Sequence, residues 1–90
     1  MNYKFWKNWK ISFKSTYCII IKFGNRQSER IYLHDYDYYE ASKEFKQYVI
    51  AYCTPKSGIC IFTLDAEEIA IPKEYVLGIF LKKLIKLSFK

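Results

Sequence analysis

The chain begins with a stretch in which apolar and polar positions alternate. In residues 3–13 the odd positions are mostly aromatic or aliphatic and the even positions mostly polar, with Trp6 as the exception. A period of two residues is typical of a strand with one buried face. The pattern therefore predicts a first strand whose solvent face presents Lys4, Trp6, Lys10 and Lys14.

Two further strands are predicted on either side of a turn. Residues 17–23 include the run Cys-Ile-Ile-Ile, which is apolar on both faces and therefore typical of a central strand. Gly24 and Asn25 tolerate positive φ and begin a polar turn that reaches Glu29. Residues 30–34 then predict a third strand that pairs back on the second.

A helix is predicted over residues 38–50. Asp37 and Glu40 have the spacing of a capping box, and the apolar residues that follow recur on one side of a helical wheel. Residues 47–53 are also rich in strand-forming types, so an alternative pairs them in a hairpin with residues 59–64. Residues 59–64 are a strand in either case.

A second helix is predicted at the C-terminal end. Residues 65–68 predict a turn or a single helical turn, and residues 69–71 predict a short edge strand. Pro72 is typical of the first turn of a helix. The apolar side of that helix comprises Leu77, Phe80, Leu81, Leu84 and Ile85. The opposite, basic side comprises Lys82, Lys83, Lys86 and Lys90.

These elements predict one α+β domain over residues 1–90. Its small antiparallel sheet has about four strands, of which three form an N-terminal meander. Two helices cover the sheet, the last of them C-terminal and amphipathic. If residues 47–53 form a strand instead, the product is a six-stranded curled sheet, similar to a PH-like barrel, capped by the C-terminal helix.

Composition adds an aromatic surplus, since 20% of the chain is Phe, Trp or Tyr. We assign most of these rings to the core of a short chain. Cys18, Cys53 and Cys60 show no redox or metal-binding spacing, and each lies in an apolar run. We see neither a signal peptide nor a segment long enough to span a bilayer. We therefore expect a soluble, cytoplasmic protein.

Charge is segregated along the chain, whose formal net charge is +6. Residues 1–28 contain six bases and no acid, and residues 76–90 contain four bases and no acid. Residues 29–75 contain nine acids and five bases. If the two basic ends meet in space, they form one cationic face that attracts polyanions.

Few residue patterns point to catalysis or to a cofactor. Three dispersed glycines argue against a phosphate-binding loop, and one histidine with scattered cysteines argues against a zinc site. Cys18 and His34 could meet across the hairpin near Asp35 and Asp37. Cys18 lies in a core strand, however, where thiols are inert. We therefore expect no catalytic residue, no cofactor and no metal.

The chain is expected to act by binding. Its small size, aromatic surplus and segregated charge favour a regulator or inhibitor that docks on a host protein or nucleoprotein complex. By association, a short chain of this composition also suits a phage or mobile element, for example as an anti-defence inhibitor of a bacterial immune nuclease. The alternative is non-specific nucleic-acid binding through the basic ends, and a third is a small metal-independent RNase toxin. Membrane binding is not expected.

The candidate partner-binding residues follow from these faces. They are Lys4, Trp6, Lys10 and Lys14 on the first strand, Arg26 and Arg30 at the first turn, and Lys82, Lys83 and Lys86 on the last helix.

Overall fold

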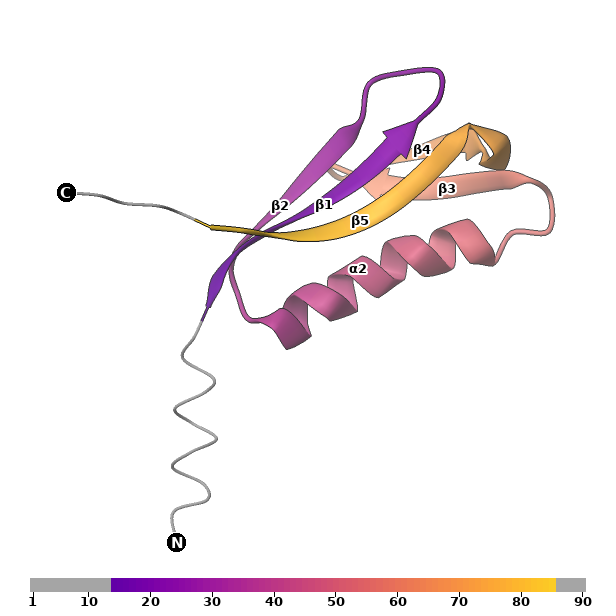
Figure 1. Ribbon diagram of the computed structural model, residues 1–90. Helices are drawn as coiled ribbons and strands as arrows, with labels where there is room; N and C mark the ends of the chain where they lie inside the picture. Colours follow the sequence, from indigo (N-terminus) through magenta and orange to yellow (C-terminus); the bar gives the residue numbers. More distant parts are fainter. Residues whose placement is uncertain (1–13, 86–90) are drawn as a thin grey trace, which may run out of the picture.

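The computed structural model describes residues 14–85, which form two antiparallel sheets and one α-helix (Figure 1). The strands are β1 (Ser15–Phe23), β2 (Glu29–Tyr36), β3 (Ile59–Leu64), β4 (Glu67–Pro72) and β5 (Val76–Leu84). The helix is α2 (Tyr38–Cys53), and a single 3-10 turn, η1 (Lys73–Tyr75), leads into β5. The α+β class and the antiparallel pairing are thus confirmed.

The larger sheet has the strand order β2-β1-β5. Its central strand is β1, as the apolar run on both faces predicted, and β2 pairs with it as expected. Ile19 lies opposite Ile31 on β2 and Leu81 on β5. Near Asp35 an extra residue on β2 bulges out of register, and Asp35 has a φ of 63°.

The helix begins as the sequence predicts and runs longer. The Glu40 amide donates to Asp37 Oδ1 at 2.8 Å, and the Asp37 amide donates to Glu40 Oε1 at 3.1 Å, which completes the capping box. α2 continues to Cys53, so the alternative strand over residues 47–53 is wrong. Its buried Ala41 and half-buried Phe45 pack against β1 and β2.

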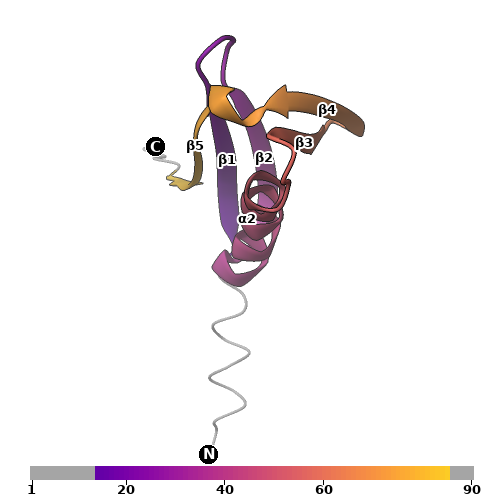
Figure 2. The same cartoon turned by 90° about the vertical axis from the view of Figure 1, so that its right-hand side faces the viewer.

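The smaller sheet is the hairpin of β3 and β4. Every second side chain of β3 is buried, namely Cys60, Phe62 and Leu64. These pack with Ile21 and Phe23 of β1 in one core cluster, so the hairpin closes one end of the larger sheet (Figure 2). The predicted strand over 59–64 is confirmed, and the edge strand over 69–71 is longer than expected.

The predicted C-terminal helix is wrong, because Val76–Leu84 is strand β5. Pro72 precedes only the single turn η1. The apolar residues of this segment fit one side of a helical wheel. They also fit a strand in which Ile79 and Leu81 lie on one face and Phe80 lies on the other. Pairing with β1 decides between the two, because a buried central strand needs hydrogen-bond partners along both edges.

Two consequences follow for the predicted architecture. The described residues contain one α-helix instead of two, and the six-stranded barrel with a helical cap is wrong. Of the three strands of the predicted N-terminal meander, the last two are β1 and β2, whereas the one predicted over residues 3–13 lies outside the described residues. On the described sheet, β5 occupies the edge of β1 that the meander would have used.

Candidate functional site

The two faces of the larger sheet differ in what covers them. On one face Tyr17, Ile19 and Leu33 are buried against α2. Side chains alternate along each strand, so the intervening positions point to the other side. We call that side the open face; it comprises Thr16, Cys18, Ile20, Lys22, Arg30, Tyr32, His34, Gly78, Phe80, Lys82 and Leu84.

Cations and aromatic rings are interleaved on the open face. Cys18 lies between Tyr32 on β2 and Lys82 on β5. The next row has Ile20 between Arg30 on β2 and Phe80 on β5. Neighbouring strands are about 4.8 Å apart, so each row places a cation and a ring about 10 Å from each other. None of the open-face positions is an acid.

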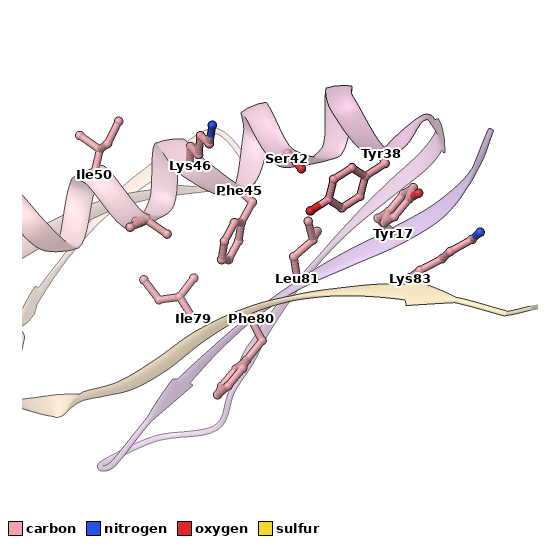
Figure 3. Close-up of a pocket in the computed structure, with 11 residues that line it drawn as sticks. Tyr17, Tyr38, Ser42, Phe45, Lys46, Ile50, Ile79, Phe80, Leu81 and Lys83 are labelled. Atoms are coloured by element: carbon pink, nitrogen blue, oxygen red, sulfur yellow. The ribbon is translucent and has the colours of Figure 1, made fainter. Parts of the chain in front are cut away.

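Two rings of the open face are exposed to solvent. Tyr32 is 51% exposed and Phe80 is 47% exposed. The Tyr32 ring stacks on His34 with centroids 6.3 Å apart and planes inclined by 14°. The Lys22 ammonium lies 5.5 Å from the centre of the Phe80 ring. Figure 3 shows Phe80 on the side of β5 that faces away from the helix.

Gly78 determines how Phe80 lies on the sheet. A Cβ atom at residue 78 would be 2.7 Å from Cζ of Phe80. The ring therefore occupies the space that a side chain at residue 78 would need, and it lies back over the strand instead of standing upright. Lys22 is the cross-strand partner of Gly78, which places its ammonium beside the same ring.

Cys18 lies beneath the side chains of the open face and is 2% exposed. Burial raises the pKa of its thiol, and the Arg30 and Lys82 charges only partly oppose that rise. The thiol donates a weak hydrogen bond to the Ile19 carbonyl at 3.9 Å. His34 Nδ1 is 3.4 Å from the Thr16 hydroxyl. Neither bond joins the Cys18 thiol to the imidazole, so Cys18 and His34 do not act together as a nucleophile and its general base.

A hollow of about 940 Å³ lies at the end of the open face near the start of β1. Tyr32 and His34 form one wall, and Leu84 forms part of the opposite wall. Lys14 and Lys83 contribute two cations, and Asp35 contributes one acid. A planar group could enter here beside the stacked Tyr32 and His34 rings.

The structure unites some of the predicted contact residues and separates others. Arg30 and Lys82 share the open face on either side of Cys18, and Lys14 lines the hollow beside it. Arg26 lies in the turn after β1, where its guanidinium is 3.5 Å from the Glu29 carboxylate. Lys83 is the cross-strand partner of Tyr17, and it borders both the hollow and the helix side of β5. The predicted residues Lys4, Trp6, Lys10 and Lys86 lie outside the described residues.

The described parts of the two basic ends lie side by side. β1 belongs to the first basic segment and β5 to the last, and the two strands are paired along their whole length. Their open-face lysines, Lys22 and Lys82, therefore belong to one surface. The sequence left open whether the basic ends meet, and the pairing of β1 with β5 brings their described parts together.

Three residues of this surface were missed in the sequence, namely Lys22, Tyr32 and Phe80. Phe80 was placed in the core because residues 76–84 were interpreted as a helix. Period-two alternation of Gly78, Phe80 and Lys82 was the signal that would have placed them on one strand face.

In the part of the chain that the structure describes, no three His, Cys, Asp or Glu side chains converge as metal ligands. No helix within residues 14–85 is long and apolar enough to cross a membrane. Comparison of the chain with protein-family models, with curated proteins and with solved structures found no match.

Proposed function

We propose that the protein binds single-stranded nucleic acid on the open face of the β2-β1-β5 sheet. One observation carries the proposal: three cations and two exposed rings share the open face, and the one acid beside it is Asp35 in the hollow at its end. Phosphates are attracted to such cations, and every base offers a face that can stack on an aromatic ring.

The shape of the site favours single strands over duplex. An open sheet can support unstacked bases on Tyr32 and Phe80, whereas the base faces of a duplex are hidden within the helix. Only one arginine, Arg30, lies among the open-face cations. Lysine attracts phosphate as a point charge and does not read bases through paired hydrogen bonds. Binding should therefore be weakly dependent on sequence and strongly dependent on salt.

The experiment measures the fluorescence anisotropy of labelled 20-nucleotide RNA and DNA over a series of salt concentrations. Lys82→Glu should weaken binding roughly tenfold at low salt, and loss of its phosphate contact should lower the salt slope by about one. Lys56→Glu is the matched control, because Lys56 is an exposed lysine in the loop before β3. It should change affinity much less.

The rings are tested by the double variant Tyr32→Ala and Phe80→Ala. Loss of stacking is worth about 1–3 kcal/mol per base, so affinity should fall at least tenfold. Tyr39→Ala is the control, since Tyr39 is 70% exposed on α2 and lies away from the sheet. Equal losses in the control and the double variant would contradict the site, and undetectable binding at low salt would contradict the function.

Two further functions remain separate proposals. A metal-independent RNase would shorten the labelled RNA during the titration, and His34→Ala would abolish the shortening. Electrophoresis of the RNA before and after the titration therefore distinguishes binding from cleavage.

A regulator that docks on a protein would use a different surface, namely the groove between α2 and β5.

A further inference from the structure

We propose that the groove between α2 and β5 binds an amphipathic helix with acidic flanks from a partner protein. The groove lies mainly on the helix side of β5, opposite the open face, and Phe80 borders both surfaces (Figure 3). The inference does not depend on nucleic-acid binding, and it assigns the chain a second class of ligand.

The floor and walls of the groove are apolar. Its volume is about 1070 Å³. Ile79 and Leu81 point into it from β5, and Phe45 points toward them from α2 (Figure 3). Tyr17 and Tyr38 close one end, with ring centroids 6.4 Å apart. Several lining residues remain open to solvent, among them Tyr38 at 67% and Ile50 at 58% exposed.

The length and lining of the groove fit a helix. Tyr38 and Ile50 mark its extent along α2, and twelve residues of helix rise about 18 Å. Four of the α2 side chains that line it recur every three or four residues, namely Tyr38, Ser42, Phe45 and Val49, and Lys46 and Ile50 flank this row. Such a ridge packs into the groove between the side-chain ridges of a second helix, and helix-in-groove recognition uses the same spacing in the bound segment.

Charge at the rims selects the partner. Lys46 lies on the α2 wall and Lys83 on the β5 wall, and no acid is present among the lining residues. An apolar helix stripe with a carboxylate row on each flank would meet both lysines. Residues 1–13 of this chain carry Lys4, Lys7 and Lys10 and no acid, so they would bring like charges to the same rims. Charge therefore favours an acidic partner over the chain's own N-terminal segment.

The test uses the full chain and two designed 16-residue peptides labelled with fluorescein. Both peptides have leucines on one helical stripe. The first has glutamates on both flanks, and the second has lysines at those positions. The glutamate peptide should bind at least tenfold more tightly than the lysine peptide, since exposed ion pairs contribute up to about fivefold each and like charges cost a similar factor.

Reversing the rim charges provides the decisive variant. Lys46→Glu with Lys83→Glu should invert the preference, so that the lysine peptide binds more tightly than the glutamate peptide. The matched control is Lys43→Glu with Lys56→Glu, which makes the same change in net charge away from the groove. The control should retain the original preference. Inversion by both double variants would overturn the proposal.

Other occupants would give different results. Absence of binding to the full chain, with binding after deletion of residues 1–13, would show that the chain fills its own groove and would overturn the proposal. A dimer seen by light scattering and abolished by the rim variant would assign the groove to a second copy, with the same consequence. Lys46→Glu alone should change oligonucleotide affinity less than Lys82→Glu, because Lys46 lies on α2 and lines the groove only, so failure here is distinguishable from failure of the open face.

Discussion

At the scale of single residues, burial decides what the three cysteines can do. Cys18 and Cys60 are buried, and Cys53 is exposed at the end of α2. Burial raises the pKa of the Cys18 thiol despite the adjacent Arg30 and Lys82, and it likewise raises the pKa of Cys60. A thiol held in the protonated form is a poor nucleophile. Cys18 thus fills space beneath the open face.

The cysteines should therefore differ in reactivity. In the native protein, iodoacetamide should modify Cys53 first, with Cys18 and Cys60 at least about tenfold slower because they react only when the structure opens. Peptide mass spectrometry over a time course measures the three rates. In concentrated urea the difference should disappear. Rapid modification of native Cys18 would mean that its thiol is accessible from the open face.

At the scale of elements, the turn between β3 and β4 is locally strained. Asp65 and Ala66 connect the strands with φ values of 51° and 64°. Two-residue hairpins of this kind require positive φ at both positions and favour Asn-Gly or Asp-Gly. Alanine has a Cβ that disfavours the left-handed region, by about 1–2 kcal/mol. The hairpin forms nevertheless because Phe62 and its neighbours on β3 are buried.

Ala66→Gly should therefore stabilise the protein. Removing the Cβ relieves the left-handed residue, with an expected gain of about 1 kcal/mol in the free energy of unfolding. The measurement is the urea midpoint. Ala70→Gly is the control, since it makes the same substitution inside β4 and should cost about 0.5–1 kcal/mol. A loss of stability in Ala66→Gly would contradict the strained turn.

At the scale of the whole molecule, α2, the larger sheet and the hairpin are joined through shared core residues. Ile31, Tyr48 and Ile79 each pack against both hydrophobic clusters. The Tyr48 hydroxyl donates to the Thr63 carbonyl at 3.1 Å, which links the helix to β3. Burial, and secondarily the Glu44 charge, raises the pKa of Tyr48. The shared residues make unfolding of one cluster disturb the other.

Stability should consequently fall in alkaline solution. The pKa values of Cys18, Cys60 and Tyr48 are raised on folding, so the unfolded chain loses these protons first. Their contribution is complete below the ordinary values, 9.0 for cysteine and 10.0 for tyrosine, and is lost as the pH rises through the native values.

The measurement is the urea midpoint between pH 8 and pH 10.5. Tyr48→Phe should lower the free energy of unfolding at pH 8 by about 1 kcal/mol, because one hydrogen bond is lost, and the urea midpoint should fall accordingly. The same variant should show a smaller alkaline decrease, because it lacks one of the titrating groups. A midpoint that rises with pH in this range would contradict the sign of these shifts.

Much of this molecule was predictable from local signals in the sequence. The capping box at Asp37 and Glu40 marked the start of α2, because its hydrogen bonds join residues three apart. The apolar run of residues 18–21 identified a central strand, and β1 indeed pairs with β2 along one edge and with β5 along the other. The α+β class and the segregated charge followed from the same one-dimensional patterns.

The conformation of residues 76–84 and the composition of the open face depended on contacts between distant parts of the chain. That segment satisfies both a helical and a strand period, and the free edge of β1 selects the strand by offering backbone hydrogen bonds. Strand formation then places Lys82 and Phe80 on one face and Lys83 in the groove on the other. The sequence determined that the ends are basic. Pairing between β1 and β5, which are distant along the chain, decided that their charges meet on one surface.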